Sequence, residues 1–183
     1  MIKDRDKDNH YYNGDTTLTY NMNIFYLNKS PEISAIEHND KHCVKMILES
    51  AQMLCTTHRV LDGDERADEL YMYKQAHKNH PSTIWVRDNV NNYMWLYRLF
   101  EALCDEYTFR YGKGHMTDIK LREILRTPPK NILMNKDFYQ PPQCMPDEYK
   151  GEDSVEAYQK YYMGEKSSFC VWKKRPTPEW YTL

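Results

Sequence analysis

The stretch HNDKHCVKMILESAQML, residues 38–54, decides the fold and supplies the first functional candidates. Its polar residues recur at steps of four, three, four and three, a spacing that aligns side chains along one face of an α-helix. The apolar residues fall on another face, which predicts an amphipathic helix packed on a core. The polar column consists of His38, His42, Lys45, Glu49 and Gln52, and the expected core face of Val44, Ile47, Leu48, Ala51, Leu54 and Cys55.

The column combines groups that can move protons, hold a phosphate or bind a metal. Glu49 is a candidate general base, or a carboxylate that stabilises a developing positive charge. A plain ion pair with Lys45, one turn away, explains the same two residues equally well. Lys41 and Lys45 are candidate amine nucleophiles only if burial or nearby cations lower their pKa, and a phosphate contact is the preferred interpretation.

The histidines offer an alternative chemistry. His38 and His42 stand four residues apart, the spacing with which two imidazoles on a helix hold one metal ion. His77 and His80 could add ligands. An HExxH motif is absent and no further acidic ligand has a diagnostic spacing. We therefore keep a metal-dependent nucleotide or phosphodiester hydrolase as an alternative, and the leading interpretation contains no metal site.

The composition is that of a globular domain. The chain has 183 residues, 40% of them hydrophobic and 28% charged, which is enough for one domain with a core. No apolar run approaches the roughly 20 residues of a membrane span, and the polar N-terminus does not resemble a secretory signal. Five cysteines without a CxxC pair indicate reduced thiols. We expect a cytoplasmic protein that does not bind membranes, and a net charge of −2 excludes a general nucleic-acid-coating protein.

The pattern along the chain predicts an all-α fold. Residues 1–21 lack hydrophobic periodicity and are predicted to be a flexible extension, and residues 22–183 a single compact helical domain. A long irregular proline-rich segment, 127–150, and an extended basic aromatic tail, 172–183, complete it. Residues 61–75 are predicted to be a turn-rich surface excursion. Helices are expected at about 31–37, 40–58, 81–89, 90–111 and 117–126, with a last one that begins near Asp153 in a capping box with Glu156 and reaches Met163.

Basic residues outside the column are candidate DNA contacts. Arg110 and Lys113 lie at the end of the long helix, where they could grip phosphates or simply favour the helix dipole. His80 precedes Pro81 and is expected to fix the entry to a helix. The tail combines basic and aromatic residues, the form of a nucleic-acid contact, although a solvated tail explains them equally well. Its candidates are Lys173, Lys174, Arg175 and Trp180.

Three segments carry a resemblance to a known family. DKHCVKMILESAQML (40–54), HPSTIW (80–85) and YRLFEALCDEYTFRYGKGH (97–115) resemble a bacterial family of pyrimidine dimer DNA glycosylases, and more distantly the phage endonuclease V group. The seven-residue step from His42 to Glu49 has a counterpart in that group. The matching residues are Asp40, Lys41, Lys45, Glu49, Gln52, Leu54, His80, Pro81, Trp85, Tyr97, Glu106, Tyr107 and Arg110.

The resemblance implies an all-α enzyme that flips a damaged or modified nucleotide out of duplex DNA. In the endonuclease V group the N-terminal amine attacks C1′ and a glutamate assists, a part that falls here to Glu49. In this chain about 21 residues precede NIFYL, and Asn23 rather than a small threonine follows Met22. Leu48 and Gln52 stand where that group has arginines. These departures favour a glycosylase without lyase activity, in which Glu49 activates water.

The sequence thus predicts a DNA N-glycosylase that acts on a damaged or modified pyrimidine without a cofactor. The predicted catalytic residues are Glu49, His42 and Lys45. Beside the metal-dependent hydrolase, a non-catalytic nucleic-acid-binding or assembly subunit remains an alternative. The predicted DNA contacts are His38, Lys41, Gln52, His80, Arg110, Lys113, Lys173, Lys174, Arg175 and Trp180.

Overall fold

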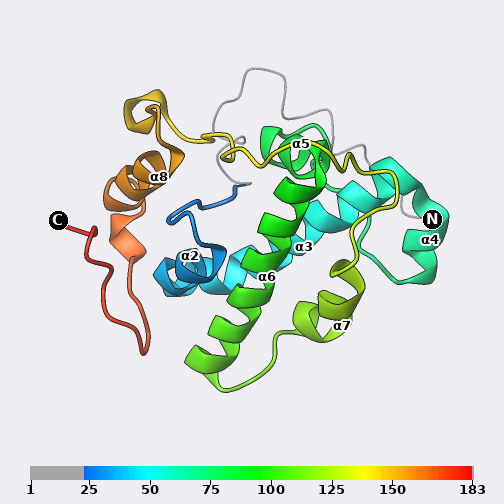
Figure 1. The fold of residues 1–183 in the computed structure, drawn as a ribbon. Coiled ribbons are helices and arrows are strands. Elements are labelled where there is room, and N and C mark those ends of the chain that lie inside the picture. The colour runs from blue at the N-terminus through cyan, green and yellow to red at the C-terminus, as the bar shows by residue number, and fades with distance from the viewer. Residues whose placement is uncertain (1–22, 183) are drawn as a thin grey trace, which may run out of the picture.

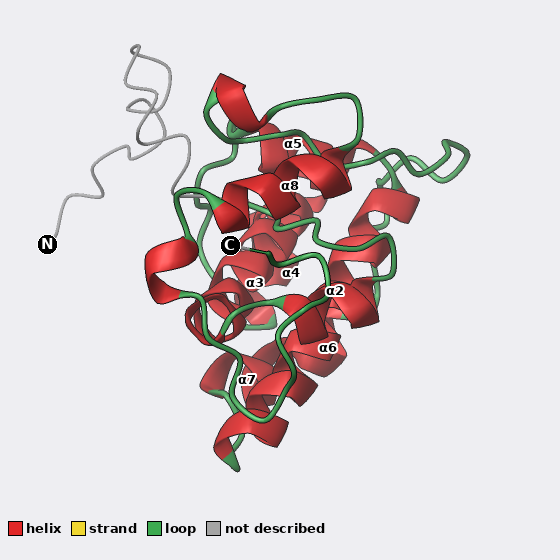
Figure 2. Ribbon diagram, turned by 90° about the vertical axis from the view of Figure 1, so that its left-hand side faces the viewer, coloured by secondary structure: helices red, strands yellow, loops and turns green. Residues whose placement is uncertain are grey.

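The computed structural model describes residues 23–182, and their regular elements are all helical (Figures 1 and 2). The all-α prediction is confirmed, while the predicted extension at 1–21 lies outside the described residues. The α-helices are α2 (Pro31–Glu37), α3 (Asp40–Asp62), α4 (Asp64–Glu69), α5 (Pro81–Asp88), α6 (Val90–Tyr111), α7 (Met116–Leu125) and α8 (Ser154–Met163), with 3-10 turns η2 (Asp147–Tyr149) and η3 (Ser167–Phe169).

Within residues 23–182, no helix has the length and apolar character that crossing a bilayer requires.

The core is built around the two long helices. Figure 1 shows α6 crossing in front of α3, and α2, α5 and α7 contact this pair. Side chains at helical spacing on α6, among them Leu96, Phe100 and Leu103, are buried against Ile47 and Leu54 of α3. Burial of these apolar faces is the main force that holds the helices together.

Local signals explain where the helices begin and end. The Ser30 side chain accepts a hydrogen bond from the Ile33 amide, and Pro31 occupies the first turn of α2. Asn39 caps α3, and Asn89 caps α6 in the same way. Gly112 ends α6 with φ +71°, a left-handed conformation that glycine adopts without steric cost. The predicted bounds of α2 and α6 are confirmed.

Three local predictions need correction. Helix α3 continues to Asp62, beyond the expected end at 58, and the supposed excursion at 61–75 contains α4. Helix α7 begins at Met116, one residue earlier than expected, because the ring of His115 accepts a capping hydrogen bond from the Thr117 amide. The predicted start and end of α8 are confirmed, and the Asp153 carboxylate accepts from the Val155 amide at the cap.

The predicted core face of α3 included two residues that are not buried. Leu48 is 41% exposed and Val44 is half-buried, whereas the other expected core residues of that face are buried. The buried arc is instead broadened by Met46, Ser50 and Met53, which lie beside Ile47 and Leu54.

The proline-rich segment is irregular, as predicted, and it is tied to α5 and α6. The Trp85 indole donates to the carbonyl of Tyr139 at 2.8 Å, and the Asn91 amide group donates to that of Lys136 at 2.7 Å. The backbone N–H of Val90 donates to the carbonyl of Leu133 at 2.9 Å. These bonds supply the backbone partners that a sheet or helix would otherwise give.

A buried ionic network joins α2, α3, α6 and the C-terminal tail. The Arg110 side chain has no exposed surface, and its Nε donates to Glu106 at 2.9 Å while Nη1 donates to Asp40 at 3.0 Å. Further donors reach the carbonyls of Ile36 and His38 at the end of α2. Glu106 also accepts from Arg175 of the tail, at 3.1 Å from Nε. The tail is therefore fastened to the helical core.

We predict that Arg110→Met lowers the free energy of unfolding by about 3–5 kcal/mol, because it leaves Asp40 and Glu106 without their shared buried partner. Urea unfolding followed by circular dichroism measures the change. Arg98→Met is the matched control, since the Arg98–Glu32 pair is exposed and such pairs contribute about 0–1 kcal/mol. Equal losses in the two variants would contradict a structural role for the network.

Candidate functional site

Glu49 lies on α3 about one turn from the buried residues Met46 and Met53, and its side chain is only 13% exposed. One oxygen, Oε1, lies 3.5 Å from the Lys45 amine. The other, Oε2, is buried and accepts no hydrogen bond from the described residues. Burial raises the pKa of Glu49 to about 7, although Lys45 and Lys166 act in the opposite direction. A carboxyl that is protonated part of the time at neutral pH suits proton transfer.

His42 lies two turns before Glu49 on the same helix and is almost completely buried. Its Nδ1 lies 2.7 Å from the hydroxyl of Tyr162, and its ring stacks on Phe25 with centroids 4.1 Å apart. Burial lowers the pKa of His42 well below its usual value, and neighbouring cations add to the effect. The imidazole is therefore neutral and held in place by α8 and the N-terminal segment.

Three lysines lie close to Glu49 or to His42. Lys41 and Lys45 come from α3, as predicted, and the Lys41 amine lies 4.4 Å from the centroid of the Phe169 ring. Lys166, which follows α8, is half-buried, with its amine 4.8 Å from the centroid of the Tyr161 ring. Burial, Lys45 and Lys41 lower the pKa of Lys166. We call Glu49, His42, Lys41, Lys45 and Lys166 the Glu49 site.

The sequence prediction missed Lys166. Its local sequence, GEKSSF, differs in no diagnostic way from other surface turns. Its place in the site depends on how the chain after α8 returns to α3, a contact between residues more than 100 positions apart. Helical periodicity contains no information about such a contact.

His38 does not belong to the column of α3. It is the C-cap of α2 and precedes α3, whose own cap is Asn39. Its Nδ1 lies 2.6 Å from the carbonyl of Ser34, and the ring is fully buried. Burial lowers the pKa of His38 to about 4. The predicted DNA contact by His38 is therefore wrong for this structure, while Gln52 keeps its half-buried place one turn after Glu49.

His80 has a structural position at the start of α5. Its Nδ1 accepts a hydrogen bond from the Ser82 amide at 3.0 Å, and the residue is buried. The prediction that His80 fixes the entry to a helix is confirmed, and a contact of this buried ring with DNA is not supported. Within residues 23–182, no group of three or more histidine, cysteine or acidic side chains is placed to hold a metal ion. The metal-dependent alternative therefore lacks the ligand set that was predicted for it.

The basic candidates near the C-terminus divide into buried and exposed residues. Arg110 and Arg175 are engaged in the ionic network, so the prediction that Arg110 grips a phosphate is wrong for this structure. Trp180 is half-buried, with its ring 6.0 Å from that of Tyr162. The tail is thus neither a free arm nor a solvated end. The exposed cations are Lys113, Lys173 and Lys174.

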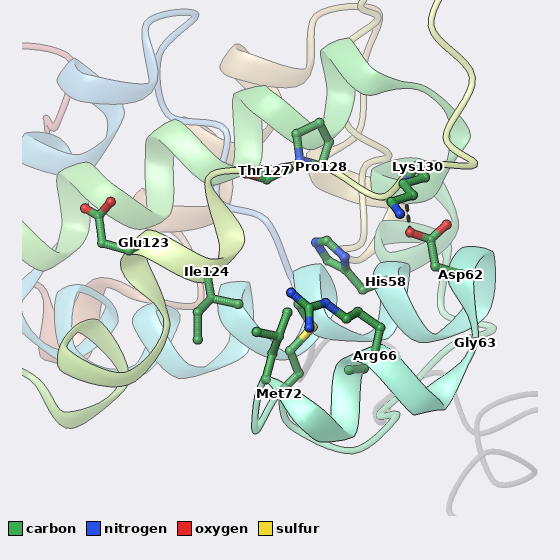
Figure 3. Close-up of a pocket in the computed structure, with 12 residues that line it drawn as sticks. His58, Asp62, Gly63, Arg66, Met72, Glu123, Ile124, Thr127, Pro128 and Lys130 are labelled. Atoms are coloured by element: carbon green, nitrogen blue, oxygen red, sulfur yellow. Dashed lines mark hydrogen bonds between the residues drawn. The ribbon is translucent and has the colours of Figure 1, made fainter.

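A separate hollow lies at the opposite end of α3 (Figure 3). It has a volume of about 470 Å³ and is bounded by α3, α4, α7 and the start of the proline-rich segment. Asp62 accepts from the backbone amides of Lys130 and Asn131, and Arg66 pairs with Glu69. Burial lowers the pKa of His58 to about 4, so its ring is neutral. These polar groups already stabilise the fold. Glu49 lies nine residues before His58 on α3, about 13 Å away along the helix axis.

A comparison with protein families identifies the group to which the chain is related. A family model described as pyrimidine dimer DNA glycosylase matches residues 22–119, just over half of the 183 residues. The chain belongs to the pyrimidine dimer DNA glycosylase family. The match includes all of α3, and with it Lys41, His42, Lys45 and Glu49, whereas Lys166 lies beyond it. No curated protein and no solved structure gave a match.

Membership of the pyrimidine dimer DNA glycosylase family supports a glycosylase-like function with DNA as the substrate. The expected resemblance is thereby confirmed. The matched residues that the structure brings together are those of α3, which present one carboxyl and two amines on one side of the helix.

We predict that Glu49→Gln stabilises this pyrimidine dimer DNA glycosylase family member at pH 8 and leaves its stability unchanged at pH 4. The pKa of Glu49 rises on folding from 4.5 to about 7, so its favourable contribution is complete below pH 4.5 and is lost as the pH rises through 7. Glutamine cannot ionise and avoids that loss, which is on the order of 2 kcal/mol for a carboxyl with slight exposure. Urea unfolding of both proteins between pH 4 and 8 measures the difference, and a difference that does not change with pH contradicts the raised pKa.

Proposed function

We propose that the protein is a DNA N-glycosylase, which cleaves the bond between a damaged or modified pyrimidine and its deoxyribose. The observation that carries this proposal is Glu49, a largely buried carboxyl with a pKa of about 7 and an oxygen that accepts no hydrogen bond from the described residues. It lies on a helix that the family model matches. The lysines of the Glu49 site fit a polyanionic substrate.

The chemistry of the bond explains why such a carboxyl is useful. As the glycosidic bond breaks, positive charge develops on the sugar and negative charge on the departing base. In its ionised form Glu49 stabilises the sugar cation or accepts a proton from the attacking group, which is water or an amine. In its protonated form it supplies a proton to the base. A pKa near 7 makes both forms available at neutral pH.

The other residues of the site support these roles. Lys45 lies 3.5 Å from Glu49 and limits the rise of its pKa, and Lys41 is free to approach a phosphate from the exposed surface. His42 is a positioning residue, because its ring is fixed between Phe25 and Tyr162 and does not face solvent. Gln52, one turn beyond Glu49, is a candidate hydrogen-bonding partner for a base.

The exposed lysines near the tail extend the proposed DNA contact. The backbone amide of Lys173 donates to Asp40 at the first turn of α3, and the Lys174 amine donates to the carbonyl of Phe109. Asp40 precedes Glu49 by nine residues, about 13 Å along the helix. That separation is less than half of the roughly 34 Å that one turn of B-DNA spans. The axial separation is therefore short compared with a duplex, and the target nucleotide is flipped from the stack.

We predict that Glu49→Gln reduces the rate of base release by about 10²–10⁴-fold, because the variant can neither accept nor donate the catalytic proton. The assay uses duplex oligonucleotides that carry pyrimidine dimers or modified pyrimidines, with the released base measured by chromatography. Binding to the same duplexes, measured by fluorescence anisotropy, should persist. Glu123→Gln is the matched control, since Glu123 is an exposed carboxylate on α7.

Two results would contradict this proposal. Base release by Glu49→Gln at the rate of the unmodified protein would remove Glu49 from the mechanism. Tight binding of the unmodified protein to every duplex, without release of any base, would instead favour the non-catalytic DNA-binding subunit.

A further inference from the structure

One face of α3 is open to solvent along the N-terminal half of the helix. Lys41, Lys45 and Leu48 are exposed there, and Gln52 is half-buried. These four residues follow one another at steps of four, three and four, so they lie along one line on the helix surface. We call them the α3 stripe. All residues from 53 to 57 are buried, so the stripe ends at Gln52.

Two packed segments bound the stripe. Before it, the amide of Asp40 donates to the carbonyl of Val171 at 2.8 Å, in the chain that returns from α8. Beyond it, the amide of Ala76 donates to the hydroxyl of Thr56 at 3.0 Å, in the segment between α4 and α5. The stripe is therefore an exposed surface between two segments that are fastened to the same helix.

Leu48 is the apolar member of the stripe. The sequence pattern predicted it to be a core residue, yet the structure leaves it 41% exposed. Lys45 lies one turn before it, with a side chain that is 49% exposed, and Gln52 lies one turn after it. A duplex that is held by the lysines would cover Leu48, and an apolar side chain gains free energy when it is removed from water.

Leu48 directly precedes Glu49. Consecutive Cα atoms are about 3.8 Å apart, which is close to the roughly 3.4 Å that one nucleotide occupies along a strand of B-DNA. The two side chains point in different directions, because neighbouring residues of a helix are rotated by about 100°. Leu48 is exposed, whereas the side chain of Glu49 is largely withdrawn from solvent. Both residues can therefore act on one nucleotide at different places.

We propose that Leu48 is the wedge that enters the base stack when the target nucleotide leaves it. This inference rests on the proposed function and deepens it by naming the residue that keeps the stack open beside Glu49. A nucleotide that leaves the stack exposes the faces of the neighbouring bases, and an apolar side chain between them offsets part of the cost of unstacking. Lys41 and Lys45 would hold phosphates on the same face of the helix.

A wedge has a distinctive dependence on the substrate. Its loss is most harmful where pairing and stacking oppose the departure of the target, and least harmful where the target has no partner base. A side chain that only stabilises α3 would affect both kinds of DNA to the same extent. The difference between the two kinds of DNA therefore identifies a wedge.

Equilibrium binding tests the proposal without knowledge of the base that is recognised. Fluorescence anisotropy compares a paired duplex with an abasic duplex, in which one nucleotide is replaced by a tetrahydrofuran residue. Both carry the same phosphates, so the lysines contribute equally to both at fixed salt concentration. We expect the unmodified protein to prefer the abasic duplex, because the wedge enters a gap that already exists. Leu48→Ala should reduce this preference by about tenfold, since it removes carbon atoms that contact base faces.

Two further variants serve as references. Leu48→Met keeps an apolar side chain of similar reach and should restore most of the preference. Val60→Ala is the matched control, because Val60 is a 38% exposed apolar residue of α3 that lies about 18 Å along the helix from Leu48. Substitutions at exposed positions change stability little, so the urea midpoints should agree. The same preference in Leu48→Ala as in Val60→Ala overturns the proposal.

Base release gives an independent reading. The substrate carries a pyrimidine that the unmodified protein releases, placed either opposite its partner base or opposite a tetrahydrofuran residue. Leu48→Ala should slow release from the paired target about tenfold more than release from the unpaired one. Equal slowing on the two substrates overturns the wedge.

The outcomes separate this inference from the proposed function. Base release that is unaffected by Leu48→Ala, on either substrate, overturns the wedge and leaves the glycosylase intact. A preference for the abasic duplex that depends on Leu48, without release of any base tested, supports the wedge and overturns the glycosylase. Absence of both the preference and base release overturns both.

Discussion

The structure depends on one buried cation, the guanidinium of Arg110. It joins the end of α2, the first residue of α3, the last turn of α6 and, through Glu106, the C-terminal tail. Burial of a charge is costly, and it is tolerated here because its donors meet carboxylates and carbonyls with good geometry. The network fixes where α3 begins, and so it also fixes the residues that α3 presents to the chain returning from α8.

Helix α3 has two faces with opposing demands. One face buries Ile47, Leu54 and their neighbours, which stabilises the fold. Another part of the surface of α3 holds Glu49, whose carboxyl loses hydration and gains only a 3.5 Å contact with Lys45. A carboxyl in this state destabilises the protein at neutral pH. Such a local cost is typical of functional sites, where a perturbed pKa is useful to the chemistry.

The sequence predicted those features that arise from local rules. Ser30 with Pro31, Asn89 and Gly112 mark helix ends through bonds within one turn, so α2 and α6 had the expected bounds. Helical spacing alone marked Glu49 as a catalytic candidate. A surface ion pair with Lys45 explained the same spacing equally well. Only burial distinguishes the two interpretations, and burial depends on residues more than 100 positions away. The prediction for Arg110 was wrong for the same reason. A basic residue at a helix end has the same local sequence whether it faces DNA or a buried carboxylate.

The charged groups of the site also shift one another's pKa values. The positive charge of Lys166 lowers the pKa of Glu49, while the charges of Lys41 and Lys45 lower that of Lys166. An approaching phosphate, being negative, would raise both pKa values. Lys41 and Lys45, which are exposed, stand where they can neutralise that phosphate first. Two exposed amines and one half-buried amine therefore balance part of the charge that a bound polyanion brings to the site.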